Sequence, residues 1–435
     1  MTQHSMIKEK IADRRATCAV VGLGYVGLPL AVELAETGFT VLGFDVSEEK
    51  VASLVAGKSY VQDVPAERLA PLVASGKLTA LSTFERIGEA DTINIAVPTP
   101  LGKTRDPDIS YIVSATEQIA RYMSADTLVI LESTTYPGTT DEVILPLLEE
   151  GGRKIGEDFF LAFSPERVDP GNPTYNTKNI PKVVGGITPA CTELAAALYA
   201  SALETVVPVE SSRVAETVKL LENTFRAVNI GLVNEIALIC SRMNINVWEV
   251  IDAAATKPFG FMPFYPGPGL GGHCIPIDPF YLSWKARLHG FEARFIELAG
   301  EINGHMPDHV VDRCAEALNS QRKALNGSKV LVLGIAYKSD IDDYRESPAL
   351  DIVKLLQSKG AELSFHDQWV KAEIPEIRDV PRRELDGASL ADVDLAVVVT
   401  AHGDVDYGEL LKNVPLIVDT RNAYKGIVSP KIFSL

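Results

Sequence analysis

The sequence predicts an α/β protein in which two doubly wound, Rossmann-like domains are joined by a central domain built on a long helix. Apolar, strand-like runs alternate with helical segments near the N-terminus, and the same alternation returns near the C-terminus. A long helical pattern covers residues 213–246 between them. A chain of 435 residues is also too long for a single core. We expect the domains to cover residues 1–205, 206–320 and 321–435.

The first α/β unit carries a pattern typical of dinucleotide binding. An apolar run ends at "GLGYVG", a helical stretch rich in Leu and Ala follows, and a second apolar run ends at Asp45. Gly22, Gly24 and Gly27 fit G-x-G-x-x-G, which lets a pyrophosphate approach the N-terminus of the helix. Asp45 stands where a carboxylate binds ribose hydroxyls, and no arginine follows closely to suit a 2'-phosphate, so we predict NAD rather than NADP. The alternative is a glycine-rich turn without a ligand.

Three further strands are predicted in "DTINIAVPTP", "DTLVILESTTYPGTT" and "FFLAFSPERVDPGNP". Each is followed by a polar loop, and in a parallel sheet such loops meet at the carboxyl edge, over the cofactor. Glu166, Arg167 and Asp169 lie in the third loop. Their position is compatible with a catalytic role and equally with solvated loop charges.

The segment 213–246 has apolar residues at spacings of three and four, which predicts a buried helix. Lys219 and Asn223 are four residues apart and therefore share one face of this helix. A surface lysine with a polar neighbour is the alternative interpretation. Against it, Asn223 and Asn229 fall in a segment otherwise suited to burial.

A second α/β unit begins at "NGSKVLVLGIAYKSD" and continues through a helix to the strand "AELSFHD". Ser347 is predicted to cap the helix at its N-terminus, and Gly360 to end it. Gly334 stands here without the full glycine triplet, so this unit is not expected to need a dinucleotide. Arg421 ends the last predicted strand, where it could meet a phosphate or a neighbouring carboxylate.

The cysteines exclude some kinds of site. No C-x-x-C pair occurs among them, so we expect neither a disulfide framework nor a zinc site, and no metal is predicted. Three of them lie in predicted helices or strands and are expected to be buried apolar residues: Cys18, Cys240 and Cys314.

Cys274 lies instead in the pliant, glycine-rich loop "GPGLGGHCIPIDP". Asp278 and Pro279 are predicted as the N-cap and first residue of the next helix, whose N-terminus favours a thiolate. A soft nucleophile in a chain that binds NAD points to covalent oxidation of an aldehyde through a thiohemiacetal and a thioester.

Composition excludes several partners. The formal net charge of -17 disfavours general attraction to nucleic acid or anionic membranes. The sequence contains no run of about 18 apolar residues, and its first 24 residues contain no long apolar segment. We therefore expect a cytoplasmic protein with no membrane span.

Seven motifs occur in an order that resembles the UDP-glucose/GDP-mannose dehydrogenases, from Ala19 to Asn422: "GLGYVGLP", "ESTTYPGTT", "SPERVDPG", "KLLEN", "GGHCIPIDP", "AYKSDIDDYRES" and "VDTRN". This family oxidises the C6 alcohol of a nucleotide sugar to a carboxylate with two NAD. The stretch "ATKPFGFMPFYPGPGLGGHCIPIDPFYL" is most similar to bacterial UDP-N-acetylglucosamine 6-dehydrogenases of surface-polysaccharide biosynthesis. Pro170 stands where the UDP-glucose branch has a second glutamate, which with Arg167 indicates an N-acetylated sugar. UDP-N-acetylmannosamine and UDP-glucose are the alternative substrates.

The resemblance implies roles for individual residues. It makes Cys274 the nucleophile, while Lys219 and Asn223 stabilise the developing alkoxide or oxyanion. Asp278 would hold the catalytic water or assist Lys219 in removing the C6 hydroxyl proton.

Glu166 would be the general base for thioester hydrolysis, with Thr134 holding water nearby. The implied cofactor contacts are Gly22, Gly24, Tyr25, Val26, Gly27, Asp45, Lys50, Thr99, Thr134 and Arg345. The implied substrate contacts are Glu166, Arg167, Lys219, Asn223, Lys257, Tyr265, Gly271, Lys338 and Arg421. Of these, Lys257 resembles a basic residue that reaches a neighbouring subunit's site.

Two rival functions are less compatible with the sequence. A two-electron alcohol dehydrogenase that releases an aldehyde does not require a thiol nucleophile. A nucleotide-binding regulatory protein without turnover would be expected to have lost one of the four residues Lys219, Asn223, Cys274 and Asp278, and all are present. The sequence therefore favours a four-electron dehydrogenase, and its long central helix favours a homodimer or a higher homo-oligomer.

Overall fold

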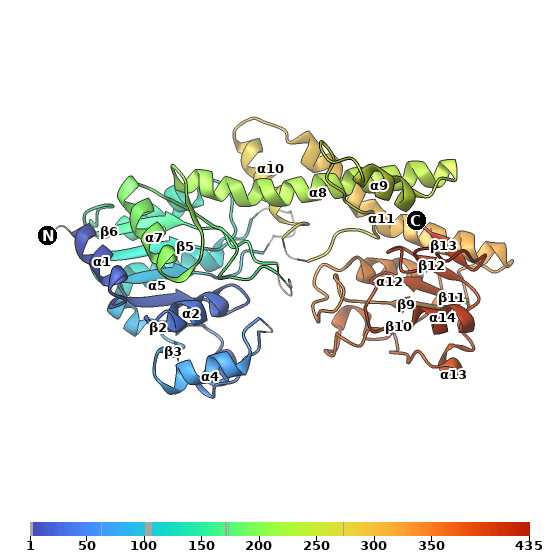
Figure 1. The fold of residues 1–435 in the computed structure, drawn as a ribbon, viewed down its shortest axis with the longest axis horizontal. Helices are drawn as coiled ribbons and strands as arrows, with labels where there is room; N and C mark the ends of the chain where they lie inside the picture. The colour runs from blue at the N-terminus through green and yellow to red at the C-terminus, as the bar shows by residue number, and fades with distance from the viewer. Residues whose placement is uncertain (1–2, 62, 101–106, 170–171, 173, 273) are drawn as a thin grey trace. The chain divides into compact units, whose positions relative to one another are not determined.

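The computed structural model describes residues 3–61, 63–100, 107–169, 172, 174–272 and 274–435. The chain forms two compact units (Figure 1). Unit 1 comprises Met1–Glu222 and Trp284–His289, and unit 2 comprises Asn223–Ser283 and Gly290–Leu435. Two helices, α8 (Ser212–Met243) and α10 (Asp278–Leu288), contribute residues to both units. The three sequence segments expected as domains stay a prediction.

Unit 1 contains an eight-stranded sheet in the order β3-β2-β1-β4-β5-β6-β7-β8. All neighbouring strands are parallel except β6 and β7. The order reverses between β1 and β4, which makes their carboxyl ends the switch point where dinucleotides bind in open α/β sheets. The strands are β1 (Thr17–Val21), β2 (Thr40–Phe44), β3 (Leu78–Leu81), β4 (Thr92–Ile95), β5 (Thr127–Leu131), β6 (Phe159–Phe163), β7 (Lys182–Gly186) and β8 (Val206–Pro208).

Helices cover both faces of this sheet because alternate strand residues point to opposite sides. Cys18 and Val20 of β1 join one apolar core, while Ala19 and Val21 join another. The first core includes residues of α1 (Gln3–Ala12), α2 (Gly27–Glu36), α3 (Glu48–Val55), α4 (Ala66–Ala74) and α7 (Pro189–Ala202). The second includes residues of α5 (Ser110–Tyr122), α6 (Leu145–Glu149), the 3-10 helix η1 (Glu85–Glu89) and the π-helix η2 (Thr140–Ile144).

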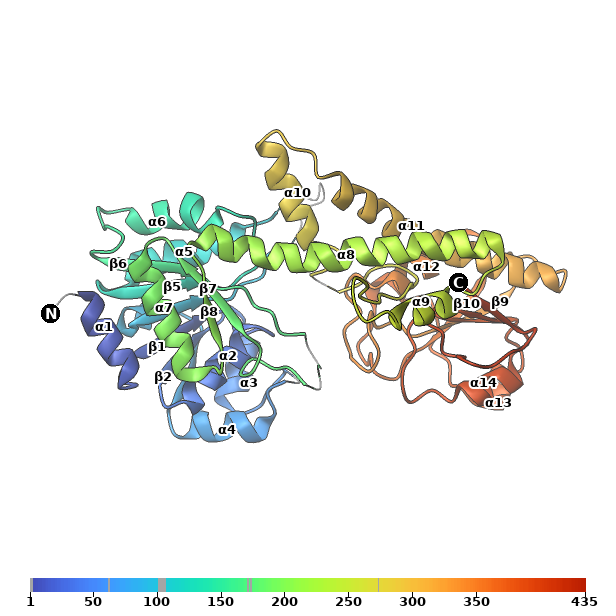
Figure 2. The ribbon, with the colours of Figure 1, turned by 45° about the horizontal axis from the view of Figure 1, so that its top comes forward.

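Unit 2 contains a parallel five-stranded sheet in the order β10-β9-β11-β12-β13. The strands are β9 (Lys329–Leu333), β10 (Glu362–His366), β11 (Leu395–Val398), β12 (Ile417–Asp419) and β13 (Ile432–Ser434). Residues of α11 (Arg294–Ser320), α12 (Pro348–Ser358) and the 3-10 helix η3 (Pro375–Ile377) pack on one face, and those of α13 (Gly387–Leu390) and α14 (Tyr407–Asn413) on the other. Helix α9 (Val247–Ala255) packs against the second half of α8 (Figure 2).

The structure confirms the predicted fold class, the predicted ends of one helix and the burial of three cysteines. The side chain of Ser347 caps α12 by accepting a hydrogen bond from the Ala349 N–H, and Gly360 adopts a φ of 81° just beyond the end of the helix. Cys18, Cys240 and Cys314 are buried, as predicted. Strand β13 was not predicted, because a three-residue strand carries too little periodicity to be recognised.

Helix α8 confirms the predicted long helix but not its complete burial. Five apolar side chains on it are 46% to 62% exposed: Leu221, Phe225, Leu232, Ile239 and Met243. At 3.6 residues per turn these positions fall on one stripe of the helix. None of the described helices is long and apolar enough to cross a membrane.

Candidate active site

The glycine loop after β1 has the geometry that a bound dinucleotide requires. Gly22 has a φ of 95°, and a Cβ there would lie 2.5 Å from the Ala96 carbonyl oxygen. A Cβ on Gly27 would lie 1.8 Å from the Gly22 carbonyl oxygen. A Cβ on Gly24, in contrast, would meet nothing within 4 Å. The first and third glycines are therefore needed for packing, whereas the second leaves open the space where a pyrophosphate approaches.

Asp45 follows β2 at the same edge of the sheet. Its carboxylate accepts hydrogen bonds from the N–H groups of Leu23 (3.0 Å) and Ser47 (2.9 Å), and the Lys50 Nζ lies 3.5 Å away. These contacts orient the carboxylate beside the glycine loop, where it can accept ribose hydroxyls. The loop and Asp45 together fit NAD.

Asp367 holds the corresponding place in unit 2, after β10, but its carboxylate is enclosed. It is buried and accepts a hydrogen bond from His402 Nε2 at 3.1 Å. It also accepts from the backbone N–H groups of Ile335, Ala336, Trp369 and Val370. Burial raises the pKa of Asp367, but these donors outweigh burial and hold the pKa well below its ordinary value. The Asp367 side chain is 0% exposed, against 8% for that of Asp45, so Asp367 is closed to a ribose.

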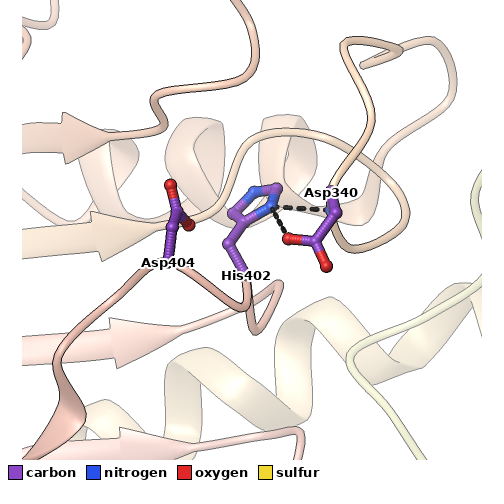
Figure 3. Close-up of side chains that lie close together, drawn as sticks. All are labelled: Asp340, His402 and Asp404. Atoms are coloured by element: carbon purple, nitrogen blue, oxygen red, sulfur yellow. Dashed lines mark hydrogen bonds and ion pairs between the residues drawn. The ribbon is translucent and has the colours of Figure 1, made fainter.

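His402 also lies between Asp340 and Asp404 (Figure 3), and one ligand atom from each lies within 4.8 Å of the others. The His402 Nδ1 accepts the Asp340 backbone N–H at 3.0 Å, while Nε2 donates to Asp367. Both ring nitrogens are therefore engaged in hydrogen bonds. A metal ion could bind this histidine only by breaking one of them.

Glu166 is held firmly in the loop after β6 of unit 1. Its Oε1 accepts the backbone N–H groups of Arg167 (2.8 Å) and Val168 (2.7 Å), and its Oε2 lies 3.2 Å from Lys182 Nζ. The Lys219 Nζ donates to the Glu166 carbonyl oxygen at 2.6 Å. Burial raises the pKa of Glu166, but the two lysines and the Val168 N–H outweigh it and lower the pKa below its ordinary value. Glu166 is therefore a carboxylate at neutral pH.

Five further predicted residues lie in unit 1. Arg167 forms a bidentate ion pair with Glu222, with Nη2 2.6 Å from Oε1 and Nε 3.2 Å from Oε2. Thr134 is partly buried in the loop after β5, and Tyr25 is half exposed in the glycine loop. Val26 and Thr99 are partly buried, and their predicted cofactor contacts stay predictions.

In unit 2, Cys274 is the one exposed cysteine. Its carbonyl oxygen accepts the N–H groups of Ile277 (3.2 Å) and Asp278 (2.8 Å), so the first turn before α10 begins at Cys274. The prediction that Asp278 is the N-cap was therefore wrong, because Asp278 lies one turn after Cys274 and is the first residue of α10 itself. Its buried carboxylate instead accepts a hydrogen bond from Asn223 Nδ2 at 2.5 Å.

The loop before Cys274 uses its glycines for close packing, where the sequence suggested pliancy. A Cβ on Gly271 would lie 2.6 Å from the Tyr337 Cβ, and one on Gly272 would lie 2.8 Å from the Tyr337 ring. The loop is also held at Gly267, whose N–H donates to Asn234 Oδ1 at 2.9 Å. Gly271 and Gly272 are thus placed where larger residues would collide with Tyr337.

Arg421 follows β12 and faces the start of this loop. Its Nε donates to the Val399 carbonyl oxygen at 2.8 Å, and a Cβ on Gly267 would lie 2.7 Å from its Nη1. Burial lowers the pKa of Arg421 to about 10, so the group stays cationic at neutral pH. No carboxylate of the described residues lies within 4 Å of this guanidinium, which makes it suited to an anionic ligand.

The other predicted contacts in unit 2 are more peripheral. Lys338 is partly buried in the loop after β9, and Arg345 pairs with Asp343 at 2.6 Å. Lys257 is exposed, with its Nζ 5.2 Å from the centre of the Phe259 ring. Tyr265 donates to Asp252 at 2.9 Å. Pro170 lies outside the described residues.

The structure thus brings Glu166 and Lys219 together in unit 1, and Asn223 and Asp278 together in unit 2. It also reveals two residues that the sequence analysis missed: Lys182, which pairs with Glu166, and Glu132, which pairs with Lys182. The sequence offered one indication of these two residues: each is a charged residue at one end of an apolar, strand-like run, Lys182 in "PKVVGG" and Glu132 in "ILESTT".

Comparison with known proteins assigns the chain to a class. Residues 16–203, 213–305 and 331–426 match, in order, the NAD-binding, central and UDP-binding domains of the UDP-glucose/GDP-mannose dehydrogenase family. The chain belongs to this family of nucleotide-sugar dehydrogenases. Its cofactor is accordingly NAD, and its UDP-binding domain indicates a UDP-sugar substrate.

Individual relatives differ in the sugar that their names record. A UDP-N-acetyl-D-glucosamine 6-dehydrogenase of Pseudomonas aeruginosa is 39% identical over 357 residues, covering 82% of this chain and 83% of that protein. A UDP-N-acetyl-D-mannosamine dehydrogenase of Escherichia coli K12 is 36% identical over 397 residues, covering 88% of this chain and 91% of that protein. The solved structure of a UDP-D-ManNAc dehydrogenase from Pyrococcus horikoshii is similar with a TM-score of 0.87 at 33% identity, covering 96% of this chain and 98% of that chain.

The glycine geometry predicts different outcomes for two similar substitutions. Gly24→Ala should fold normally but lower the affinity for NAD at least tenfold, about 1.4 kcal/mol, because its Cβ fills the open space. Gly27→Ala should instead lower the thermal stability of the apoprotein, because its Cβ collides with backbone. Calorimetric titration with NAD and thermal unfolding without it measure the two effects. An unchanged affinity for NAD in a folded Gly24→Ala variant would contradict this account of the loop.

Proposed function

We propose that the protein is an NAD-dependent UDP-N-acetylglucosamine 6-dehydrogenase that oxidises the C6 hydroxyl to a carboxylate through covalent intermediates on Cys274. The observation that carries the proposal is the setting of this thiol. Cys274 is exposed, whereas the other four cysteines are buried, and it stands at the start of a helical turn. That turn leads directly to Asp278, which is bound to Asn223. A thiol presented at a helix N-terminus is favoured as thiolate.

In the first oxidation the C6 hydroxyl must lose its proton. We assign stabilisation of the resulting alkoxide to Lys219 and Asn223, which lie one turn apart on α8. Asp278 accepts a hydrogen bond from Asn223 and thereby orients its amide. When bound, NAD accepts one hydride in each of two oxidations, so that one alcohol, one water and two NAD+ become a carboxylate, two NADH and three protons.

The Cys274 thiolate then forms a bond to the aldehyde carbon, which gives a thiohemiacetal. Loss of the second hydride from that carbon leaves a thioester. In hydrolysis, Glu166 takes a proton from water as the water oxygen bonds to the carbonyl carbon, the carbon–sulfur bond breaks, and the Cys274 thiolate is regenerated. We place Thr134 as the residue that holds this water.

The UDP group supplies a diphosphate that an acidic protein can bind only through local cations. Arg421 is the strongest candidate, because it is partly buried without a carboxylate partner among the described residues and faces the Gly267 loop. We assign supporting contacts to Lys338 and Gly271. The remaining proposed contacts to the substrate are made by Arg167, Tyr265 and Lys257, and Arg345 is proposed to contact the cofactor.

The identity of the sugar is supported by the Cys274 region and by named relatives. The Pseudomonas aeruginosa UDP-N-acetyl-D-glucosamine 6-dehydrogenase and one of Salmonella typhi, at 39% and 36% identity, favour UDP-N-acetylglucosamine. The UDP-N-acetyl-D-mannosamine dehydrogenases, at 34% to 36% identity, make UDP-N-acetylmannosamine the second candidate. A role in surface-polysaccharide biosynthesis is part of the proposal.

We also propose that the protein works as a homodimer or higher homo-oligomer. The exposed apolar stripe of α8, from Leu221 to Met243, is the surface we assign to a second copy of the chain. Lys257 is exposed, as a contact to a neighbouring subunit's site requires.

A charge placed in the stripe should separate the copies. Leu232→Glu should lower the mass measured by analytical ultracentrifugation to that of one chain, because a carboxylate cannot be buried unpaired in an apolar interface. Val55→Glu replaces an apolar residue of similar exposure on α3, 59% against 52% for Leu232, and should leave the mass unchanged. A wild-type protein of single-chain mass at micromolar concentration would contradict the proposed oligomer.

Turnover of four sugars tests the proposed reaction. NADH formation should be fastest with UDP-N-acetylglucosamine among UDP-glucose, UDP-N-acetylglucosamine, UDP-N-acetylmannosamine and UDP-N-acetylgalactosamine, with two NADH formed for each sugar consumed. Preference for UDP-N-acetylmannosamine would move the assignment to the second candidate. Release of one NADH per sugar, with free aldehyde as product, would contradict the four-electron reaction.

A further inference from the structure

Lys182 is a buried cation for which the proposed reaction gives no role. It is the first residue of β7, and its side chain is 3% exposed. A buried lysine is costly unless it is paired, so its position needs a physical explanation.

The antiparallel pairing of β6 and β7 explains how Lys182 reaches Glu166. The register sets Ala162 opposite Gly186 and Phe163 opposite Gly185. Continuing this register three residues beyond the end of β6, and back to the first residue of β7, brings Lys182 opposite Glu166. The Lys182 Nζ lies 3.2 Å from Glu166 Oε2.

Lys182 is itself held by a second carboxylate. Its Nζ lies 2.6 Å from Glu132 Oε2, and the Glu132 side chain is completely buried after β5. The other oxygen of Glu132 accepts from Asn94 Nδ2 and from the Tyr199 hydroxyl, each at 2.7 Å. These two donors hold the Glu132 carboxylate in place, and the carboxylate in turn restrains Lys182 beside Glu166.

The hydrogen bonds leave one position open on the Glu166 carboxylate. Oε1 accepts two backbone N–H groups, whereas Oε2 accepts only Lys182 among the described residues. Each carboxylate oxygen has two lone pairs, so the second lone pair of Oε2 is the one available to take a proton from water. Lys182 thus contacts the oxygen that carries this lone pair, and it acts together with the Val168 N–H and Lys219 to keep the carboxylate ionised.

We propose that Lys182 is a positioning residue that keeps Glu166 ionised and fixes its Oε2 for thioester hydrolysis, with Glu132 holding the lysine in place. This inference rests on the proposed role of Glu166 as the general base. Other charged or titratable groups near Glu166 are Lys219 on α8, Tyr199 on α7 and Arg167, which is paired with Glu222. Of the two cations that contact Glu166, Lys182 contacts its carboxylate and Lys219 its backbone carbonyl.

The test is a set of variants that separates charge from packing. Lys182→Met alone would leave two buried carboxylates without their shared cation and could prevent folding. Lys182→Met combined with Glu132→Gln keeps the net charge of the three-residue cluster at -1, because it removes one cation and one anion together. Lys182→Arg retains the cation. Lys285→Met removes a lysine that pairs with Glu142 elsewhere in unit 1 and is the matched control.

The expected result is a change in pH dependence. A general base is inactive once protonated, so the rate of hydrolysis falls as the pH drops through the pKa of Glu166. This fall in rate at low pH is the acid limb of the pH profile. In the double variant the acid limb should move to higher pH by at least about one unit, since Lys182 no longer opposes the effect of burial on the pKa of Glu166. The rate of hydrolysis at high pH should also fall, because Oε2 is no longer fixed by Lys182, whereas the KM for the UDP-sugar and the first oxidation should change little. Lys182→Arg and Lys285→Met should keep the wild-type limb.

A measurement without turnover distinguishes failure of this inference from failure of the proposed function. Protein labelled with [5-13C]glutamate should show a Glu166 resonance, assigned by its absence in Glu166→Gln, whose titration moves to higher pH in the double variant. Movement of the resonance without movement of the acid limb would show that Glu166 is not the base, which overturns the reaction proposed for it. If neither moves in a folded double variant, the proposal for Lys182 is wrong.

Discussion

A single lysine, Lys182, is buried between Glu132 and Glu166 at the carboxyl edge of the first sheet, and the charge state of Glu166 depends on it. Lys182 and Glu132 are removed from water, and their mutual contact of 2.6 Å compensates the cost only because Asn94 and Tyr199 complete the hydrogen bonds around them. This arrangement lets Glu166 remain charged in a largely buried place. The chemistry proposed for Glu166 follows from that charge, because only an ionised carboxylate can accept a proton from water.

The two sheets use the same position in opposite ways. The carboxylate after the second strand of unit 1, Asp45, stays at the edge of the glycine loop, whereas its counterpart Asp367 is buried under His402 and backbone donors. The first arrangement leaves a carboxylate for a ligand, and the second uses it to stabilise the fold. This difference agrees with the domains of the family that the two segments match, an NAD-binding domain and a UDP-binding domain.

The sequence was sufficient where a feature is local. The glycine triplet, Asp45, the cap at Ser347 and the shared face of Lys219 and Asn223 depend on spacing along the chain. Lys182 could not be found in this way, because a parallel β7 would have placed it at the opposite edge from Glu166, and only the antiparallel pairing brings the two together. The close packing of Gly271 and Gly272 before Cys274 could not be predicted either, since a sequence does not distinguish a mobile glycine from a tightly packed one.

The covalent reaction at Cys274 is the central claim, and trapping its intermediate tests it most directly. Glu166→Gln should complete both oxidations of UDP-N-acetylglucosamine but stop before hydrolysis, since the amide cannot take a proton from water. Intact-protein mass spectrometry after mixing with substrate and NAD should then show an adduct with the mass of the substrate acyl group, located by peptide mapping on Cys274 and absent when Cys274→Ser is added. The account would be contradicted if the Glu166→Gln variant formed two NADH per sugar at the wild-type rate without any adduct.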